Sequence, residues 1–115
     1  MTHYETLIFI TYCKEMGLPP PKLEFTFCKG RKWRFDFVWL YSDFEGVKGR
    51  VALEVEGGVF SGGRHTRGAG FLKDIEKYNT AQLLGFILLR TTPTGLCKIE
   101  TIEMVRKALK MKGII

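Results

Sequence analysis

The sequence predicts an α/β fold in which a single mixed β-sheet is flanked by helices, in the order α-β-β-β-α-β-α. Segments with alternating or continuous apolar residues are separated by segments with helical periodicity, which gives this order. The 115 residues suffice for one hydrophobic core but not for two, so we expect a single domain over residues 1–115. With 45% hydrophobic and 26% charged residues, the composition is that of an ordinary globular protein.

The chain is expected to begin with a helix from residue 4 to residue 16, followed by three strands. Thr2 and Glu5 have the spacing of a capping box, which marks the start of this helix, and Gly17 marks its end. Strands are expected over residues 23–27, 33–40 and 50–58, and a short polar loop over residues 41–49 joins the last two. The short connections indicate an antiparallel meander.

Side-chain alternation along the second and third strands brings several carboxylates together. Glu54 and Glu56 share one face of the third strand, and Asp36 lies on the same face of the second strand as Arg34. The opposite faces carry the apolar residues Trp33, Phe35, Phe37, Trp39, Val51, Leu53 and Val55. If the hairpin is centred near Glu45, the numbers of facing residues sum to about ninety, and Asp36 faces Glu54 with Cβ atoms about 4.5–5.5 Å apart. Two carboxylates this close require a cation, and a divalent metal with oxygen ligands is the natural candidate.

A glycine-rich segment over residues 57–70 follows the third strand. It carries Arg64, His65 and Arg67, whose side chains suit a ligand that bears phosphate. It lacks the Gly-Lys-Ser/Thr end of an ATP-binding loop and the strand–Gly-x-Gly-x-x-Gly–helix order of a dinucleotide site, so neither ATP nor NAD is expected. His65 is open to three interpretations, as a general base, a phosphate contact or an ordinary loop residue.

The remaining elements are a helix over residues 71–84, an apolar strand over residues 86–90 and a helix over residues 100–112. A buried strand directly after a helix indicates a crossover and parallel pairing within the sheet. Lys73 and Lys77 lie four residues apart on one side of the first of these helices, where they either line a site or remain solvated.

The properties of the whole chain favour a nucleic-acid partner and a reducing compartment. A formal net charge of +6 and a pI near 9.4 favour an anionic partner, most commonly nucleic acid. The three cysteines lack metal-binding spacing, which indicates reduced thiols in the cytoplasm. No apolar run approaches the roughly 18–20 residues of a membrane span, and the N-terminus lacks a signal pattern, so no membrane association is expected.

Together with the order of elements, four short motifs resemble the PD-(D/E)xK nuclease superfamily. They are RKWRFD at residues 31–36, EVEGG at residues 54–58, GRHTRG at residues 63–68 and DIEKYN at residues 74–79. They look most similar to small nuclease-like proteins of phage and prophage genomes, which resemble very-short-patch repair endonucleases and Holliday junction resolvases. The resemblance covers most of the chain, about residues 4 to 90, and implies a restriction-endonuclease-like core.

This resemblance implies a Mg²⁺- or Mn²⁺-dependent deoxyribonuclease in the cytoplasm of a bacterium or a phage-infected cell. In the family, acidic residues of the second and third strands hold the metal, which here implies Asp36, Glu54 and the backbone carbonyl of Val55. The third-strand motif normally ends in a lysine that positions the attacking water, but this chain has Glu56 there. Either Glu56 itself or Lys77 would then take that role. The residues expected to contact DNA are Arg31, Lys32, Arg34, Arg64, His65, Arg67 and Lys73.

Several alternatives remain open at this point. Glu5 either assists the metal site, as a first-helix glutamate does in similar families, or serves only in the capping box. Trp33 and Trp39 fit a core better than a base-stacking platform. The rival function is a catalytically inactive nuclease fold that binds DNA or a protein, and the departure at Glu56 favours it. The DNA substrate is open between a junction, a mismatch, a specific site and plain duplex. Cutting of two strands by so small a domain would indicate a homodimer, whereas nicking would not.

Overall fold

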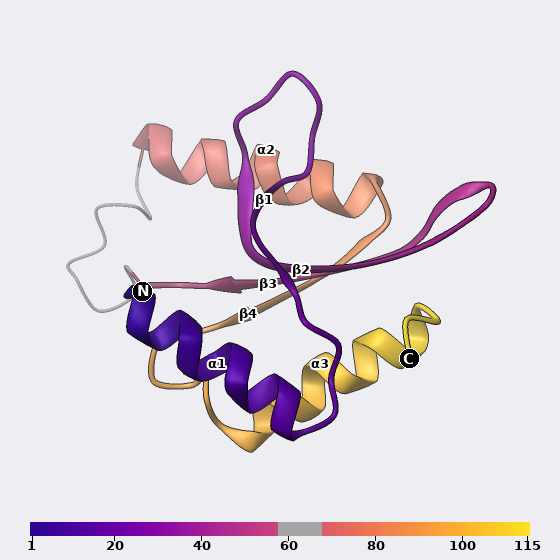
Figure 1. Cartoon of the computed structure of the whole chain (residues 1–115). Coiled ribbons are helices and arrows are strands. Elements are labelled where there is room, and N and C mark those ends of the chain that lie inside the picture. The colour runs from indigo at the N-terminus through magenta and orange to yellow at the C-terminus, as the bar shows by residue number, and fades with distance from the viewer. Residues whose placement is uncertain (58–67) are drawn as a thin grey trace.

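A computed structural model describes residues 1–57 and 68–115 and has the predicted order of elements (Figure 1). The elements are α1 (His3–Glu15), β1 (Lys22–Thr26), β2 (Arg34–Asp43), β3 (Gly46–Val55), α2 (Gly68–Leu83), β4 (Phe86–Thr91) and α3 (Ile99–Met111). The expected polar loop over residues 41–49 is wrong, because β2 and β3 continue to Asp43 and Gly46 and close through a tight turn. In that turn the Glu45 N–H donates to Asp43 Oδ1 at 2.8 Å.

The four strands form one mixed sheet, as predicted, and the structure gives their order as β1-β2-β3-β4. The pairs β1–β2 and β2–β3 are antiparallel, and β4 runs parallel to β3 after the crossover through α2. From Phe37↔Leu53 to Tyr41↔Gly49 the facing residue numbers of β2 and β3 sum to 90, which is the predicted register. Among the described residues, no helix is long and apolar enough to cross a membrane.

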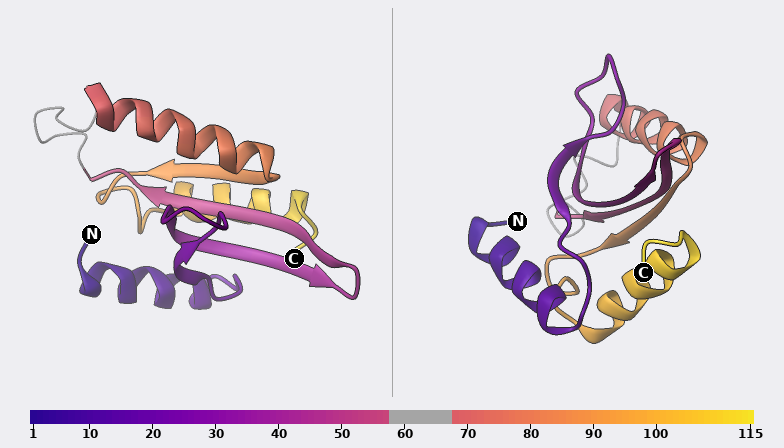
Figure 2. Two further views of the ribbon diagram at one scale, coloured as in Figure 1. Left: turned by 90° about the horizontal axis from the view of Figure 1, so that it is seen from above. Right: turned by 45° about the vertical axis from the view of Figure 1, so that its right-hand side comes forward.

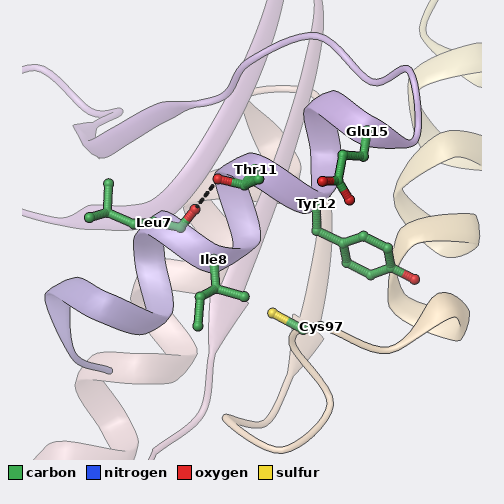
Figure 3. Close-up of a pocket in the computed structure, with 6 residues that line it drawn as sticks. All are labelled: Leu7, Ile8, Thr11, Tyr12, Glu15 and Cys97. Atoms are coloured by element: carbon green, nitrogen blue, oxygen red, sulfur yellow. Dashed lines mark hydrogen bonds between the residues drawn. The ribbon is translucent and has the colours of Figure 1, made fainter.

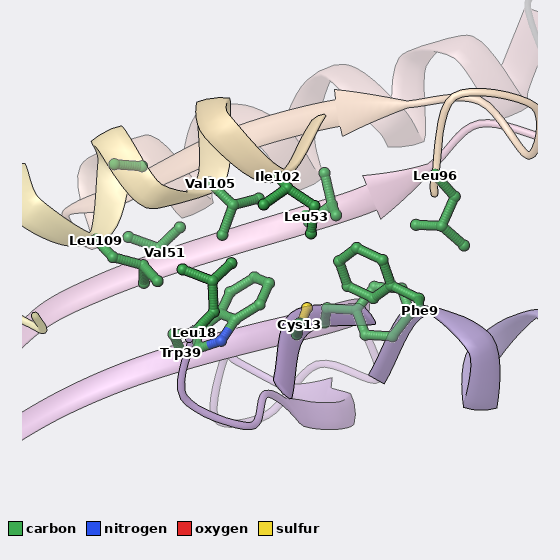
Figure 4. Packing of buried hydrophobic residues seen from close by; sticks show 12 residues of the cluster. Phe9, Cys13, Leu18, Trp39, Val51, Leu53, Leu96, Ile102, Val105 and Leu109 are labelled. Atoms are coloured by element: carbon green, nitrogen blue, oxygen red, sulfur yellow. The ribbon is translucent and has the colours of Figure 1, made fainter. Parts of the chain in front are cut away.

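Helices cover both faces of the sheet, with α1 and α3 on one side and α2 on the other (Figure 2). The core between the sheet and the α1/α3 layer includes the fully buried side chains of Phe9, Phe37, Leu53, Ile102 and Leu109 (Figure 4). The core under α2 contains Phe35, Val38, Ala52, Ala81 and Phe86. The middle of β2 and of β3 is therefore apolar on both faces, and their polar residues are confined to the strand ends.

The alternation of side chains along β2 breaks at Asp36. Phe35 packs in the core under α2, whereas Phe37 packs in the core under α1 and α3, although a regular strand would put both on one face. The prediction that the aromatic residues of β2 share one face is therefore wrong for Phe35. Opposite Asp36 in β1 lies Glu24, whose φ of 48° is in the left-handed region that non-glycine residues rarely adopt. The break therefore lies where β1 is itself irregular.

Candidate functional site

Asp36 and Glu54 meet where β2 and β3 separate. Pairing of the two strands begins at Phe37 and Leu53, and beyond it each carboxylate bonds to the backbone of the other strand. The Asp36 N–H donates to Glu54 Oε1 at 3.1 Å, and the Val55 N–H donates to Asp36 Oδ2 at 2.8 Å. These reciprocal bonds hold the two carboxylates close together, just beyond the last residues that pair in the β2–β3 ladder.

Lys77 of α2 reaches the same pair of carboxylates. Its Nζ donates to Glu54 Oε2 at 2.8 Å, and the two side chains are only 16% and 12% exposed. The ammonium also lies 4.9 Å from the centroid of the Phe35 ring. Burial raises the pKa of Glu54 from its ordinary value of 4.5 to about 7, and the Lys77 ammonium opposes that rise. The helix thus places a cation against the acidic pair.

An open cleft of about 450 Å³ contains this group. Asp36, Glu54, Val55 and Lys77 line it. In an extended strand the N–H and C=O of one residue point to the same side, so the Val55 carbonyl points toward the side on which its N–H bonds to Asp36. The cleft therefore gathers carboxylate and carbonyl oxygens, the donors that Mg²⁺ and Mn²⁺ prefer.

The donor set fits a metal ion that keeps much of its water. Within residues 1–57 and 68–115, no group of three or more His, Cys, Asp or Glu side chains could hold a metal. Two carboxylates, one carbonyl and several water molecules would have to suffice. Mg²⁺ is usually bound in this way, through one or two carboxylates with water in its other positions.

Glu56 is engaged by two other side chains. Its Oε1 accepts a hydrogen bond from the Tyr78 hydroxyl at 3.2 Å and lies 3.2 Å from Arg90 Nε. The Arg90 guanidinium also lies 3.8 Å from the centroid of the Tyr78 ring. Burial, and then the charge of Glu56, raises the pKa of Tyr78, so its hydroxyl remains a donor at neutral pH. The Glu56 carboxylate is therefore part of a contact that joins β3, β4 and α2.

The basic residues predicted to contact DNA lie in different surroundings. Lys32, Arg34 and Lys73 line the cleft beside the carboxylates. Arg31 is held by an ion pair, with its NH1 atom 2.6 Å from Glu76 Oε1. The other three predicted residues, Arg64, His65 and Arg67, lie outside the described residues.

The two tryptophans have separate roles. Trp39 is 2% exposed and its Nε1 donates to the Pro19 carbonyl at 2.8 Å, which confirms its place in the core. Trp33 is partly exposed, lines the cleft and lies under the Arg31 guanidinium, which is 3.7 Å from its ring centroid. Its other neighbour is Phe27, with the ring centroids 6.1 Å apart. Trp33 therefore forms part of the cleft wall.

Glu5 forms the predicted capping box at the start of α1. The Thr2 N–H donates to Glu5 Oε2 at 2.7 Å, and the Glu5 N–H donates to Thr2 Oγ1 at 3.1 Å. Thr2 and His3 share a hollow with Asp36, so the N-terminus of α1 lies beside the acidic pair. The Glu5 side chain lines neither this hollow nor the cleft.

Three residues of the site were not singled out from the sequence, namely Glu24, Tyr78 and Arg90. Glu24 lines the cleft opposite Asp36, and extending the strand register from β2 to β1 would have located it. Tyr78 directly follows Lys77, but its contact with Glu56 depends on how α2 crosses the sheet. Arg90 faces Glu54 in the parallel β3–β4 register, which the sequence pattern does not define.

Comparison of the chain with protein-family models, with curated proteins and with solved structures finds no match. The chemistry of the cleft is therefore the feature of this protein that points to a function.

Proposed function

We propose that this protein is a Mg²⁺- or Mn²⁺-dependent deoxyribonuclease of the PD-(D/E)xK type. The observation that carries the proposal is the reciprocal pairing of Asp36 and Glu54, with Lys77 2.8 Å from Glu54 in a cleft lined by further basic side chains. Two carboxylates held this close favour a cation, and the oxygen donors favour a hard divalent one. The basic residues suit a phosphate backbone.

In the proposed mechanism Asp36, Glu54 and the Val55 carbonyl would hold the metal ion. When bound, the ion polarises the scissile phosphate and lowers the pKa of water. Lys77, fixed by its bond to Glu54, orients the attacking water and offsets the negative charge that develops on the phosphate. The residues that hold the DNA backbone by charge are Lys32, Arg34 and Lys73, so affinity should be salt-dependent and largely independent of sequence.

Glu56 takes a supporting role in this proposal. Its carboxylate is matched by Arg90 and Tyr78, so it keeps β3 and β4 aligned under the acidic pair instead of positioning water. A DNA substrate and three free cysteines fit the cytoplasm of a bacterium or a phage-infected cell.

A cleavage panel tests the proposal. Duplex, single-stranded, mismatched, flap and four-way-junction DNA are incubated with the purified protein and Mg²⁺, Mn²⁺ or a chelator. We expect cleavage of at least one form with metal and none with the chelator. Asp36→Asn should lower the rate by about 10²–10³-fold, the cost of removing one group that stabilises charge in a transition state.

The Asp36→Asn variant should fold, because an asparagine carbonyl still accepts the Val55 N–H. Glu103→Gln is the matched control. It removes an exposed carboxylate of α3 that pairs with Arg106 and is distant in sequence from the cleft residues. This variant should cleave DNA like the wild type. If the folded wild-type protein cuts none of these DNA forms with either metal, the proposed activity is wrong.

A second candidate is a catalytically inactive nuclease fold that binds nucleic acid or a protein. The observation that favours it is Glu56, which stands where such nucleases normally have a lysine and which forms an ion pair with Arg90. Calorimetric titration with Mn²⁺ separates the two candidates. If the protein is a nuclease, it should bind Mn²⁺, and Asp36→Asn should weaken that binding. If it is an inactive fold, Mn²⁺ should give no binding heat that depends on Asp36. The inactive fold should also bind DNA equally well with and without metal.

A further inference from the structure

The outer part of the β2–β3 hairpin, residues 41–48, extends from the body of the protein as a two-stranded arm (Figures 1 and 2). β1 pairs with β2 only as far as Val38, and β4 pairs with β3 only from Arg50 onward. Within residues 1–57 and 68–115 the arm therefore has no further strand on either side. An isolated two-stranded hairpin is marginally stable in water, so a folded arm gains stability if another surface covers it.

The arm carries apolar side chains that the described part of its own chain leaves exposed. Phe44 at the tip is 96% exposed, and Tyr41 and Val47 are 39% and 38% exposed. A fully buried phenylalanine would remove about 150–250 Å² from water. The arm thus presents an anchor residue of the kind that dominates binding energy in protein interfaces.

The tip of the arm is acidic although the chain as a whole is basic. Asp43 and Glu45 flank Phe44, and Lys48, the only basic residue of the arm, pairs with Glu45 at 3.7 Å. The formal net charge of the whole chain is +6. The tip is therefore suited to a surface that is apolar in the middle and basic at its edge, and it is poorly suited to the phosphates of DNA.

Such a surface exists at the base of the same hairpin. A hollow of about 350 Å³ is lined by apolar side chains, including Val47 of the arm itself, and by two cationic residues, Lys29 and Arg50. The other apolar side chains are those of Phe25, Phe27, Leu40 and Phe86. We call this hollow the socket. It is large enough for one aromatic ring, and its charges are opposite to those beside Phe44.

We propose that the arm of one copy of this protein inserts Phe44 into the socket of a second copy, and that the second copy does the same in return. Leu40, which lines the socket, is four residues from Phe44, about 13 Å along the strand. Two hairpins that overlap antiparallel can therefore satisfy both contacts about a two-fold axis midway between tip and socket. Such a reciprocal contact is the self-complementary interface that two-fold symmetry produces.

The groove between α1 and the loop that carries Cys97 is the competing apolar surface (Figure 3). It is lined by Leu7, Ile8, Thr11, Tyr12, Glu15 and Cys97. Its charged residue, Glu15, has the same sign as the carboxylates of the arm tip, so this groove would repel the tip. The socket, with two cations, is the better match.

The expected dimer is weak and depends on salt. Two Phe44 rings and the neighbouring arm residues form an interface below the area of a standard stable complex, so the dissociation constant should be in the micromolar range. The charge pairs at its rim are exposed, so raising the salt concentration should weaken association. The proposal is independent of the proposed nuclease activity, because it uses no residue of the Asp36 cleft.

Sedimentation velocity over a concentration series tests the proposal. The wild-type protein should change from monomer to dimer in the micromolar range, and Phe44→Asp should weaken the dimer by at least about tenfold. Leu7→Asp, on the α1 groove, is the matched control and should leave association unchanged. Circular dichroism melts confirm that each variant is folded.

A charge-exchange experiment tests the reciprocal geometry. Glu45→Lys and Lys29→Glu should each weaken self-association, because each homodimer then has two mismatched contacts. In an equimolar mixture one contact is reversed in sign and the other is native, so the mixture should dimerise better than either variant alone. A mixture that dimerises no better than its components would overturn the reciprocal arrangement.

Three outcomes would contradict the proposal as a whole. The wild-type protein could remain monomeric up to about 1 mM. Leu7→Asp could abolish a dimer that Phe44→Asp leaves intact, which would place the interface on α1. Phe44→Asp could lower DNA affinity without changing the association state, which would assign the arm to nucleic acid.

Discussion

Replacing Lys77 by methionine removes the ammonium group that faces Glu54 but keeps a side chain of similar length against Phe35. The Lys77 and Glu54 side chains are 16% and 12% exposed and lie 2.8 Å apart, so the variant leaves a nearly buried carboxylate without its cation. Breaking a buried pair costs about 3–5 kcal/mol when the remaining group stays charged. Since this pair is not completely buried and Glu54 can take up a proton, we expect a loss of about 2–3 kcal/mol near pH 8.5.

This loss of stability should depend on pH with a definite sign. Burial raises the pKa of Glu54 from 4.5 to about 7, so in this window the native state binds more protons than the unfolded state. The stability of the wild-type protein therefore falls as the pH rises through the window. Without Lys77 the pKa of Glu54 rises further, so the stability of the variant continues to fall as the pH rises above neutral. The difference in the free energy of unfolding between the wild type and Lys77→Met is thus small near pH 5.5 and reaches its full value near pH 8.5.

Urea denaturation at the two pH values, followed by circular dichroism, measures the difference. Lys73→Met is the matched control, because Lys73 lies one turn earlier on α2 and is exposed; its effect should stay within about 0.5 kcal/mol. An equal loss for Lys77→Met at both pH values would mean that packing, and not charge, accounts for its effect. The absence of any loss would show that the Lys77–Glu54 contact does not stabilise the fold.

Three further predictions concern the capping residue Glu5, the Arg90–Glu56 ion pair and the free cysteines. Glu5→Gln should lower stability by at most about 1 kcal/mol through the weakened cap and leave Mn²⁺ affinity in calorimetry unchanged; a tenfold loss of affinity would instead place Glu5 at the metal site. Arg90→Met should cost about 1 kcal/mol in urea denaturation, because the Arg90–Glu56 pair is partly exposed, and should leave DNA cleavage within about tenfold of wild type. Burial raises the pKa of the Cys13 thiol to about 12, so a thiol reagent should label exposed Cys97 in the native protein and reach Cys13 only after unfolding; rapid labelling of Cys13 would contradict this.

The pairing of Asp36 with Glu54 could be predicted from the sequence because strand alternation and a central turn fix a hairpin register. The facing residues of β2 and β3 follow the predicted sum over five consecutive pairs. Val51 and Leu53 occupy the predicted apolar face of β3, which packs under α1 and α3. A one-residue slip would expose that whole face, so burial itself enforces the register.

The features that the sequence did not predict depend on contacts between distant segments. Phe35 and Phe37 are equally apolar, and the irregular backbone at Glu24 in the neighbouring strand coincides with the change of face between them. The contact of Glu56 with Arg90 depends on the parallel register of β4. The outer hairpin was taken for a loop because the arm, residues 41–48, projects beyond both cores and has no buried face to impose apolar alternation.

The raised pKa of Glu54 makes proton release the most direct sign of a metal ion in this cleft. Asp36 and Glu54 are the two carboxylates of the proposed metal site, and Lys77 pairs with Glu54. Burial raises the pKa of Glu54 to about 7, so near pH 6 its carboxyl group is mostly protonated when no metal is bound. A divalent ion must displace that proton, because metal ligands bind in their deprotonated form. Calorimetry in buffers of different ionisation enthalpy should therefore detect close to one proton released per Mn²⁺ near pH 6 and almost none near pH 8.5. Metal binding without proton release at the lower pH would mean that Glu54 is not a ligand, and the role of the acidic pair would then have to be reassigned.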